Sequence, residues 1–297
     1  MKVAVTGATG FLGRYIVRHL IDSGHVCRCW HREGSDRGGF DHVEAGVEWV
    51  PGDLTDVDSM RSLVDGADAV VHAALYRPGA GFRGAEGDLA EFVERNVLGS
   101  IRLIEAARAA DVVRFVFIST CAVHEVILDD RKLDEAHPLW PMSHYGAHKA
   151  AIEKFVHSYG LAEGFEICAL RPTGIYGVAR PVSGSKWYDL VHAVKRGEAV
   201  SSATGGKEVH AADVAKAVGI LLKAEGVAGQ AYNCYDMYIA QQDVARVAKN
   251  LTGSPSEIQM LNKGPKSQID TSKLRGLGME FGGLLRLEQT VFEMLDG

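Results

Sequence analysis

The feature that most constrains the fold is a glycine-rich turn near the start of the chain. Gly7, Gly10 and Gly13 lie three residues apart, directly after the apolar segment Lys2–Thr6 and at the start of the helical pattern Phe11–Ser23. The first glycine permits a tight turn, the second lets the backbone approach a pyrophosphate, and the third lets the helix pack closely on the strand. The helix start presents unpaired N–H groups and a positive dipole to phosphate oxygens. The turn therefore predicts a dinucleotide site.

Apolar strand patterns and helical patterns alternate up to Pro172, which indicates a parallel sheet covered by helices on both faces. Right-handed crossovers then predict an α/β, doubly wound parallel sheet of Rossmann type, whose ligands bind at the carboxyl ends of its strands. The expected strands are Lys2–Thr6, His25–Trp30, Val47–Pro51, Ala69–His72, Arg114–Ser119 and Glu166–Leu170. The expected helices are Phe11–Ser23, Asp56–Asp65, Leu89–Ala110 and Tyr145–Ala162.

After Pro172 the pattern becomes less regular. Residues 1–172 are expected to form the dinucleotide-binding domain, and residues 173–297 mainly a smaller, discontinuous C-terminal substrate-binding lobe with some segments returning to the first domain. Gly174–Gly184 and Ala199–Glu208 are rich in glycine and serine and are expected to be loops. The mixed charges of Asp129–Glu135 predict a solvated loop. Helices are expected at Lys186–Arg196, Asp213–Lys223, Gln241–Leu251 and Leu284–Leu295.

Composition narrows the class of partner. The net charge is −6, which argues against nucleic acid as the main partner because phosphate binding favours a basic surface. No stretch approaches the roughly 20 apolar residues of a membrane span, and no signal-peptide pattern is present. The five cysteines are scattered, with Cys27 and Cys29 on one face of an expected strand, and indicate buried reduced thiols. We expect a cytoplasmic protein with a small-molecule substrate, and neither nucleic acid nor a membrane as partner.

The ends of the expected strands bear on the choice of cofactor. An NAD enzyme usually offers a carboxylate after the second strand, whereas this chain has His31 and then Arg32. Arg32 could pair with the 2′-phosphate of NADP, which favours NADP over NAD, or could simply be solvated. Asp53, after the third strand, could accept from the adenine amino group or cap the next helix. The small residues Ala73 and Ala74 would let the backbone run beside a cofactor.

The expected chemical centre is a tyrosine and a lysine on one helix face. A phenol with a pKa near 10 is a poor base at neutral pH, but the Lys149 ammonium and a positively charged nicotinamide would both favour the Tyr145 phenolate. Tyr145 can then take the proton of a substrate hydroxyl as hydride leaves, or supply it in reduction. Ser119 and Thr120, at a strand end, are candidates to donate to the same oxygen. The alternatives are a surface tyrosine beside a solvated lysine, and ordinary turn hydroxyls.

With these residues identified, the chain resembles the extended short-chain dehydrogenase/reductase superfamily, of the NAD(P)-dependent epimerase/dehydratase type. The resemblance covers essentially the whole chain and depends on the order and spacing of several motifs. In chain order, these are Thr6–Gly13 (TGxxGxxG), Gly52–Leu54 (GDL), Asn96 on the long fourth helix of the family, Thr120, Tyr145 with Lys149 (YxxxK), Leu170–Gly177 (LRPxxxYG), Val209–Val214 (VHVxDV) and Asp270–Leu274 (DxSK).

The resemblance implies that Tyr145 is the acid/base, that Thr120 orients the substrate oxygen, and that Lys149 also holds the nicotinamide ribose. It implies a homodimer through the helices near 88–110 and 145–163. The expected cofactor-binding residues are Gly7, Thr9, Gly10, Phe11, Leu12, Gly13, His31, Arg32, Asp53, Leu54, Ala73, Ala74, Asn96, Ser119, Tyr145, Lys149, Pro172 and Thr173. The expected substrate-binding residues are Leu75, Thr120, Cys121, Ala122, Tyr145 and Lys207.

Two departures from the family patterns narrow the function, and a pair of histidines is considered as a metal site. Cys121 and Ala122 replace the Asp–Glu pair that serves water elimination in the sugar-nucleotide dehydratases that the chain resembles, so dehydration is disfavoured. Gly206 replaces an arginine that pairs with a diphosphate in nucleotide-sugar enzymes, with Lys207 beside it as a substitute. His144 and His148 have the spacing of zinc ligands, but no carboxylate completes an HExxH pattern and the family implies no metal, so we expect none.

The favoured expectation is an NAD(P)-dependent oxidoreductase or epimerase. It would act by hydride transfer at a secondary alcohol or ketone carbon of a sugar or nucleotide-sugar-like substrate. The alternative is an NADPH-dependent reductase of a small carbonyl compound, which would consume cofactor in each turnover. A non-catalytic dinucleotide-sensing protein is the least favoured, because such proteins typically lack the tyrosine or the lysine.

Overall fold

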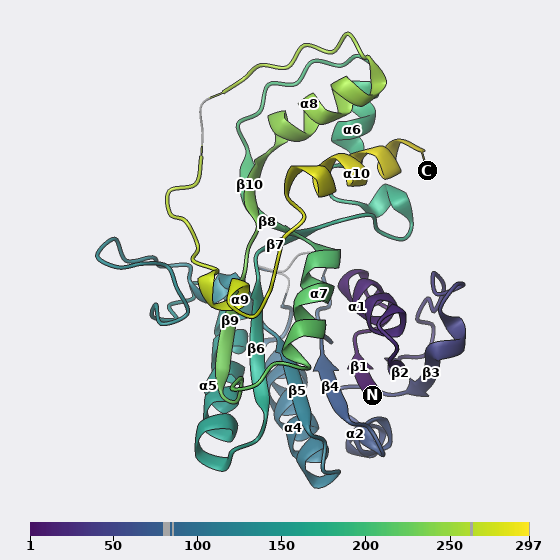
Figure 1. Ribbon diagram of the computed structural model, residues 1–297, viewed down its shortest axis with the longest axis vertical. Coiled ribbons are helices and arrows are strands. Elements are labelled where there is room, and N and C mark those ends of the chain that lie inside the picture. The colour runs from purple at the N-terminus through teal and green to yellow at the C-terminus, as the bar shows by residue number, and fades with distance from the viewer. Residues whose placement is uncertain (80–83, 85, 262–263, 297) are drawn as a thin grey trace. The chain divides into compact units, whose positions relative to one another are not determined.

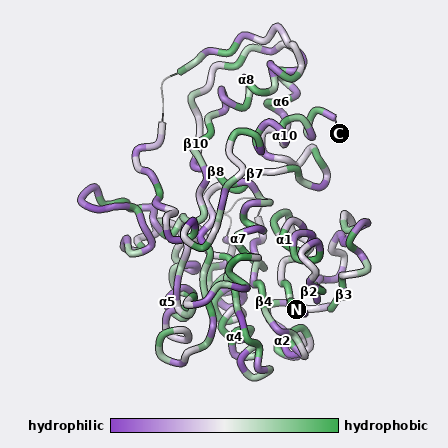
Figure 2. The backbone as a smooth tube through the Cα atoms, in the orientation of Figure 1, coloured by the Kyte–Doolittle hydropathy of each residue, from purple (hydrophilic) through white to green (hydrophobic). Residues whose placement is uncertain are grey.

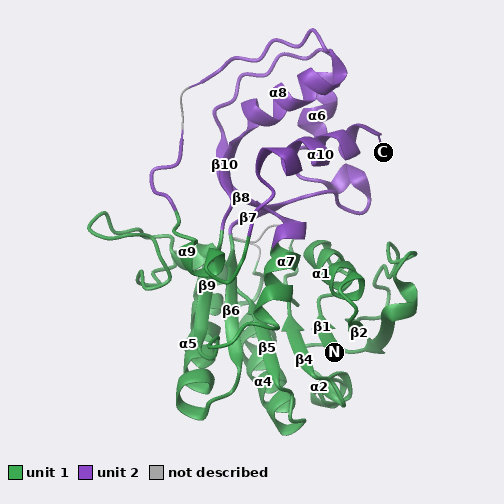
Figure 3. Ribbon diagram, viewed as in Figure 1, with its two compact units in different colours: residues 1–172, 214–234, 269–279 green, residues 173–213, 235–268, 280–297 purple. Residues whose placement is uncertain are grey.

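The computed structural model describes residues 1–79, 84, 86–261 and 264–296, and the chain divides into two compact units (Figure 3). Unit 1 comprises residues 1–172, 214–234 and 269–279, and unit 2 comprises residues 173–213, 235–268 and 280–297. No helix among the described residues has both the length and the apolar character needed to cross a bilayer.

Unit 1 is built on a seven-stranded parallel sheet, which confirms the expected doubly wound fold (Figure 1). The strand order is β3-β2-β1-β4-β5-β6-β9. The direction of winding reverses between β1 and β4, so the carboxyl ends of these two strands form the switch point at which such sheets bind ligands. The strands are β1 (Lys2–Thr6), β2 (Val26–His31), β3 (Val47–Pro51), β4 (Ala69–His72), β5 (Arg114–Ile118), β6 (Ile167–Pro172) and β9 (Gln230–Cys234).

Helices cover both faces of this sheet. Helix α4 contacts α2 and α5 on one face, while Gly219 of α7 lies against His19 of α1 on the other (Figure 1). Green and purple segments alternate along α1 in Figure 2, as expected for a helix with one buried face. The helices are α1 (Phe11–Asp22), α2 (Val57–Val64), α3 (Leu89–Val93), α4 (Gly99–Ala109), α5 (His144–Glu163), α7 (Ala211–Leu221) and α9 (Ser272–Arg275).

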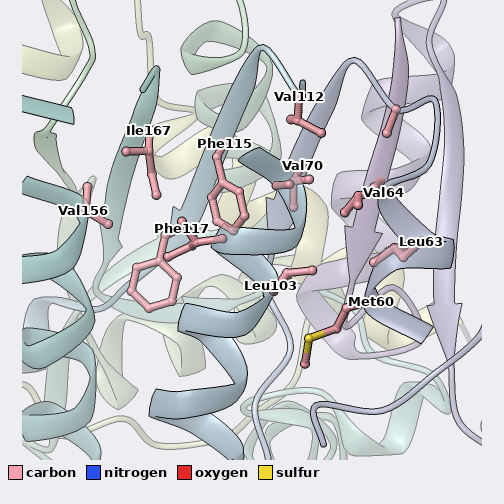
Figure 4. Packing of buried hydrophobic residues seen from close by; sticks show 14 of the residues in the cluster. Met60, Leu63, Val64, Val70, Leu103, Val112, Phe115, Phe117, Val156 and Ile167 are labelled. Carbon is pink, nitrogen blue, oxygen red and sulfur yellow. The ribbon is translucent and has the colours of Figure 1, made fainter. Parts of the chain in front are cut away.

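The core between the sheet and helices α2, α4 and α5 is apolar (Figure 4). Phe115 and Phe117 are alternate residues of β5, so both side chains point to the same face, where Leu103 of α4 also packs. Each fully buried side chain of this size contributes roughly 1.5–3 kcal/mol through removal of apolar surface from water. This cluster therefore fixes α4 and α5 against the sheet, and α5 carries the expected site residues Tyr145 and Lys149.

The expected helix Leu89–Ala110 is not a regular α-helix throughout. A π-helical turn, Glu94–Leu98, separates α3 from α4. Such turns insert an extra residue and often occur at functional sites. Asn96 lies within this turn and is buried.

Unit 2 contains a three-stranded sheet in the order β10-β8-β7. The prediction of loops at Gly174–Gly184 and Ala199–Glu208 was wrong in part, because β7 and β8 form there. Both strands contain glycine, but pairing stabilises them. The central strand β8 pairs in parallel with β7 and antiparallel with β10. The elements are β7 (Gly174–Tyr176), β8 (Gly205–His210), β10 (Met237–Ala240), α6 (Tyr188–Lys195), α8 (Gln241–Thr252) and α10 (Gly283–Asp296).

The acidic run Asp129–Glu135 is not a fully solvated loop as expected. Leu133 is buried and forms a bridge to Ile269, and Glu135 accepts a hydrogen bond from the backbone N–H of Asn233 at 2.8 Å. Four of the five cysteines are buried free thiols as expected, whereas Cys121 is only half-buried.

Candidate active site

The glycine turn that follows β1 lies directly against the carboxyl end of the neighbouring strand β4. Gly7 has a φ of +73°, and a Cβ atom there would lie 2.7 Å from the carbonyl carbon of Ala73 and 2.8 Å from the nitrogen of Ala74. A Cβ atom at Gly13 would collide with the carbonyl oxygen of Gly7. The backbone therefore closes tightly around the turn, as the sequence predicted for a phosphate-binding loop.

The start of α1 fits a pyrophosphate. Gly10 is the N-cap residue, no side chain of the described residues caps the helix, and its first turn contains no acidic residue. The first N–H groups and the positive end of the dipole are therefore not matched by a carboxylate of the helix's own first turn. Together with the backbone cradle at Gly7, this arrangement fits the phosphates of a dinucleotide.

A hydrogen-bond chain through His72 links the ends of β1 and β4 to α4. Ser100 Oγ donates to the carbonyl oxygen of Asn96 at 2.5 Å, so it must accept from His72 Nε2 at 2.8 Å. Nδ1 then accepts from Thr6 Oγ1 at 2.7 Å, and Thr6 Oγ1 accepts from the N–H of Ala74 at 3.1 Å. Burial, and secondly Lys149, lowers the pKa of His72 to about 3, so the ring is neutral. This series of hydrogen bonds, which sequence reasoning missed, fixes the backbone at the switch point.

Asn96 stabilises the segment that follows β4. Its Nδ2 donates to the carbonyl oxygens of Tyr76 and Phe92, and its Oδ1 accepts from the N–H of Tyr76 at 2.8 Å. The amide therefore holds the backbone next to Leu75, a half-buried residue expected to contact substrate.

The expected adenine-side residues lie at the ends of β2 and β3. Arg32 is exposed, and its backbone N–H donates to Ser35 Oγ. Asp53 Oδ1 accepts from both the N–H and the hydroxyl of Thr55. The alternative that Asp53 caps the next helix was wrong, because Asp56 is the N-cap of α2.

Arg14 contacts the loop that follows β2 and was not anticipated from the sequence. It lies on α1 directly after Gly13 and is buried. Its guanidinium donates to the carbonyl oxygens of Thr9 and Gly38 and pairs with Asp36 at 3.0 Å. Arg14 thus joins the glycine turn to the loop after β2. Its position next to the last glycine of the turn was the only signal in the sequence.

The start of α5 brings the expected catalytic residues to the end of β5. Ser143 is the N-cap residue and accepts from the N–H of Gly146. A Cβ atom at Gly146 would lie 2.7 Å from the carbonyl oxygen of Ala122, so this glycine lets α5 approach the turn that follows Thr120. Tyr145, next to Gly146, is half-buried on the first turn of the helix.

Lys149 lies one helical turn after Tyr145 and is buried. Its Nζ donates to the carbonyl oxygen of Ile118 at 2.8 Å and lies 4.6 Å from the centre of the Phe117 ring. Burial lowers the pKa of Lys149 to about 7, although Glu153 opposes this shift. Thr120, two residues after Ile118, is buried, and its Oγ1 accepts from the N–H of Ala122. A hydroxyl that accepts one bond can still donate its own proton, as the predicted role requires.

A buried ion pair lies beneath this centre. Arg171 donates from Nε to both carboxylate oxygens of Glu153 at 3.0 Å, and from Nη2 to Oε2 at 2.6 Å. Ser119 Oγ also donates to Glu153 Oε1, so its hydroxyl is directed into this pair. Arg171 Nη1 further contacts His124 Nε2 at 3.2 Å and the carbonyl oxygen of Glu135. The only signal in the sequence was weak, namely that Glu153 lies four residues after Lys149.

The remaining residues expected to bind cofactor or substrate are divided between the two units. Cys121 Sγ donates to the carbonyl oxygen of Arg171. Pro172 ends β6, and Thr173 begins unit 2. Lys207 lies on β8 opposite Tyr238.

The two histidines with zinc-ligand spacing lie in different environments. His144 is exposed, whereas His148 is buried with its ring edge-on to Phe92 at 5.0 Å. Burial, followed by the charge of Lys149, lowers the pKa of His148 to about 2.

Comparisons with known proteins agree with this geometry. The family model described as the NAD dependent epimerase/dehydratase family matches residues 3–234. A 3β-hydroxysteroid dehydrogenase/Δ5→4-isomerase of Mycobacterium tuberculosis is 31% identical over 185 residues, 59% of this chain and 47% of that protein. The match thus spans about half the length of that relative. The low-salt glycan biosynthesis protein Agl12 of Haloferax volcanii is 28% identical over 296 residues, 94% of this chain and 93% of that protein.

The fold is also similar to that of solved structures. A UDP-glucose 4-epimerase of Thermus thermophilus, solved in complex with NAD, has a TM-score of 0.78 at 24% identity and covers 99% of both chains. The family match extends from β1 to β9, across the glycine turn, the end of β5 and the start of α5. The chain therefore belongs to the NAD-dependent epimerase/dehydratase family, of the extended short-chain dehydrogenase/reductase type.

Proposed function

We propose that this chain is an NAD(P)-dependent oxidoreductase or epimerase that acts at a secondary alcohol or ketone carbon of a sugar or sugar-like substrate. The observation that carries the proposal is the anchoring of Lys149. Its ammonium binds the carbonyl oxygen of Ile118, two residues before Thr120, and the lysine lies one helical turn after Tyr145. A buried lysine held beside a strand end and a half-buried phenol is an arrangement suited to proton transfer.

In this proposal, Tyr145 moves the proton. During oxidation, the Tyr145 oxygen accepts the hydroxyl proton of the substrate while the carbinol carbon loses hydride and a C=O bond forms. During reduction, the Tyr145 hydroxyl returns that proton to the carbonyl oxygen. Thr120 donates a hydrogen bond to the same substrate oxygen, and the Lys149 ammonium stabilises the phenolate form of Tyr145. A bound nicotinamide supplies the hydride acceptor or donor.

The cofactor is held by the residues around the switch point. The N–H groups at the start of α1 bind the pyrophosphate, and the backbone at Ala73 and Ala74 lies beside the turn. Arg32 is exposed at the end of β2, where an arginine can pair with a 2′-phosphate, so we propose NADP in preference to NAD. The solved relative from Thermus thermophilus holds NAD, so both cofactors belong in the test.

Relatives of two kinds bear on the proposed substrate class. Agl12 is a glycan biosynthesis protein that matches nearly the whole chain, whereas the steroid dehydrogenase matches 59% of it. Coverage therefore favours a sugar-like substrate. The second candidate, reduction of a small carbonyl compound with NADPH, is favoured by Arg32, which can pair with the 2′-phosphate of NADPH.

We further propose a homodimer through α3, α4 and α5. Large apolar side chains on α3, α5 and the π turn that leads into α4 are exposed by 40% or more, namely Leu89, Val93, Leu98, Phe155 and Leu161. Burial of such side chains against a second copy removes apolar surface from water, which stabilises the dimer. Sedimentation analysis of Phe155→Glu should show loss of the dimer, and a monomeric wild-type protein would refute this.

A turnover screen tests the proposed function. The purified chain is incubated with NAD or NADP, in oxidised or reduced form, and with UDP-glucose, free hexoses, 3β-hydroxysteroids and small ketones. An epimerase inverts a carbinol centre, detected by NMR, without net change in reduced nicotinamide. A reductase consumes reduced nicotinamide stoichiometrically. Absence of both activities with every alcohol and ketone class would refute the proposal.

A further inference from the structure

Unit 2 contains a buried carboxylate, one oxygen of which accepts no hydrogen bond from any residue that the structure describes. Glu208 of β8 is 3% exposed, and its Oε1 accepts from Lys186 Nζ at 2.6 Å. Its Oε2 is buried and has no hydrogen-bond partner among the residues that the structure describes. Burial of an unpaired acceptor on a charged group costs free energy, so an arrangement of this kind calls for an explanation.

Two glycines make the space that this carboxylate occupies. Gly174 of β7 lies opposite Glu208 in the sheet, and Gly206 lies two residues before it on the same face. A Cβ atom at Gly174 would lie 2.5 Å from Oε2, and one at Gly206 would lie 2.5 Å from Oε1. Gly174 is itself exposed, so the buried Oε2 lies close to an exposed stretch of glycine backbone.

A tyrosine on the same face of the sheet and a tryptophan next to Lys186 lie near the carboxylate. Tyr176 lies two residues after Gly174, and its buried hydroxyl also has no partner within the described part of the chain. Its ring lies 5.3 Å from that of Trp187, and Lys186 Nζ lies 5.0 Å from the centre of the same indole. Trp187 has a φ of 72°, an unfavourable conformation for a side chain of this size. Sparsely populated conformations of this kind cluster at ligand-binding sites.

The charges of Glu208 and Lys186 indicate which ligand this pair takes. Glu208 and Lys186 neutralise each other, so the pair offers no net attraction to a diphosphate. Burial raises the pKa of Glu208, an effect that Lys186 opposes. Carboxylate and ammonium side by side instead present one acceptor and one donor, which match neighbouring hydroxyl groups on a ring.

We propose that Glu208, Lys186 and Tyr176 form a substrate-recognition site in unit 2 for a neutral, hydroxyl-rich group such as a sugar ring or another polyol. Glu208 Oε2 accepts from one hydroxyl, and the Lys186 ammonium, whose side chain is 38% exposed, donates to a neighbouring one. This inference rests on the proposed function, which it deepens by naming the part of the substrate that unit 2 recognises. It assigns the recognition role to Glu208 in place of its neighbour Lys207.

Ligand-observed NMR with defined probes tests the site. The full chain, saturated with NADP, is titrated with D-galactose and myo-inositol as neutral polyols, with cyclohexanol as a single hydroxyl, and with UDP as an anion. At least one polyol should bind more tightly than both cyclohexanol and UDP. Glu208→Gln should weaken that polyol about tenfold, because the acceptor loses its charge while its shape is kept. Lys186→Met should weaken it by a similar factor.

The matched control is Glu198→Gln. Glu198 also forms an ion pair in unit 2, with Arg196, but its side chain is 56% exposed, and its replacement should leave polyol affinity within about twofold. Equal polyol affinity in wild type and Glu208→Gln, tighter binding of UDP, or no polyol binding would overturn the inference. A lower melting temperature of Glu208→Gln with wild-type polyol affinity in Lys186→Met would also overturn it, since the pair would then be structural.

The two proposals fail in different ways. If wild-type protein binds polyols through Glu208 but transfers no hydride with any substrate, the proposed function fails and the site remains. If hydride transfer proceeds and neither KM nor polyol affinity responds to Glu208→Gln, the site fails and the proposed function remains.

Discussion

Replacing Arg171 by methionine would leave Glu153 without its counter-charge in the interior of unit 1. Both side chains are 1% exposed, and their closest contact is 2.6 Å. Two unit charges about 3 Å apart attract by roughly 5 kcal/mol at an effective dielectric constant of about 20. Removal of one partner of a buried pair costs about 3–5 kcal/mol in practice. We therefore expect Arg171→Met to lower the free energy of unfolding by about 4 kcal/mol.

Urea denaturation followed by tryptophan fluorescence measures this loss, because Trp30, Trp49 and Trp140 all lie in unit 1. The matched control is Arg61→Met, which breaks a pair with Asp58 whose side chains are 70% and 89% exposed. It should change the free energy of unfolding by less than about 0.5 kcal/mol.

A double variant separates the ion pair from its surroundings. With Glu153→Met added to Arg171→Met, two apolar side chains replace the two charges, and most of the lost stability should return. Ser119 then loses its acceptor, which limits the recovery. A loss of less than about 1 kcal/mol in Arg171→Met, or losses that simply add in the double variant, would refute this reasoning.

Three further predictions concern the cofactor and the lysine. Gly13→Ala should weaken NADPH binding at least about tenfold in a fluorescence titration, because the new Cβ collides with Gly7, whereas Gly184→Ala, whose nearest atom would be 3.8 Å away, should not. Arg32→Ala should weaken NADP about tenfold and leave NAD unchanged; an equal loss for both would exclude Arg32 from phosphate recognition. The pKa of Lys149 is lowered to about 7, so the folded state binds fewer protons than the unfolded state above that pH. Stability relative to Lys149→Met should therefore rise by about 3 kcal/mol between pH 7 and pH 9.5, and a flat difference would place the ammonium in a solvated environment.

The parts of the fold that could be predicted from sequence are those that depend on short-range patterns. The glycine turn, the apolar strands and the Tyr145–Lys149 spacing each depend on residues close together in the chain, and the first six strands of the parallel sheet lie within a few residues of the expected bounds. Pairing between distant segments could not be read in this way. Strands β7 and β8 contain glycines that normally indicate loops, and their pairing depends on β10, far along the chain.

Side-chain partners explain what was missed at the site. His72 bonds to Thr6 and Ser100, 66 and 28 residues away, and Glu153 pairs with Arg171 across α5 and β6. No local pattern marks such contacts, because the fold alone brings the partners together. Glu208 was placed in a loop for the same reason, and its unused oxygen becomes evident only when Gly174 lies opposite it.

The central claim is that the Tyr145 phenol transfers the proton. Single-turnover measurements on Tyr145→Phe test it most directly, together with the dissociation constant of the dinucleotide for the same variant. Loss of the hydroxyl should slow hydride transfer at least about 100-fold, the usual contribution of a general acid or base, and should leave dinucleotide affinity within about twofold. A variant that transfers hydride at the wild-type rate would contradict the account.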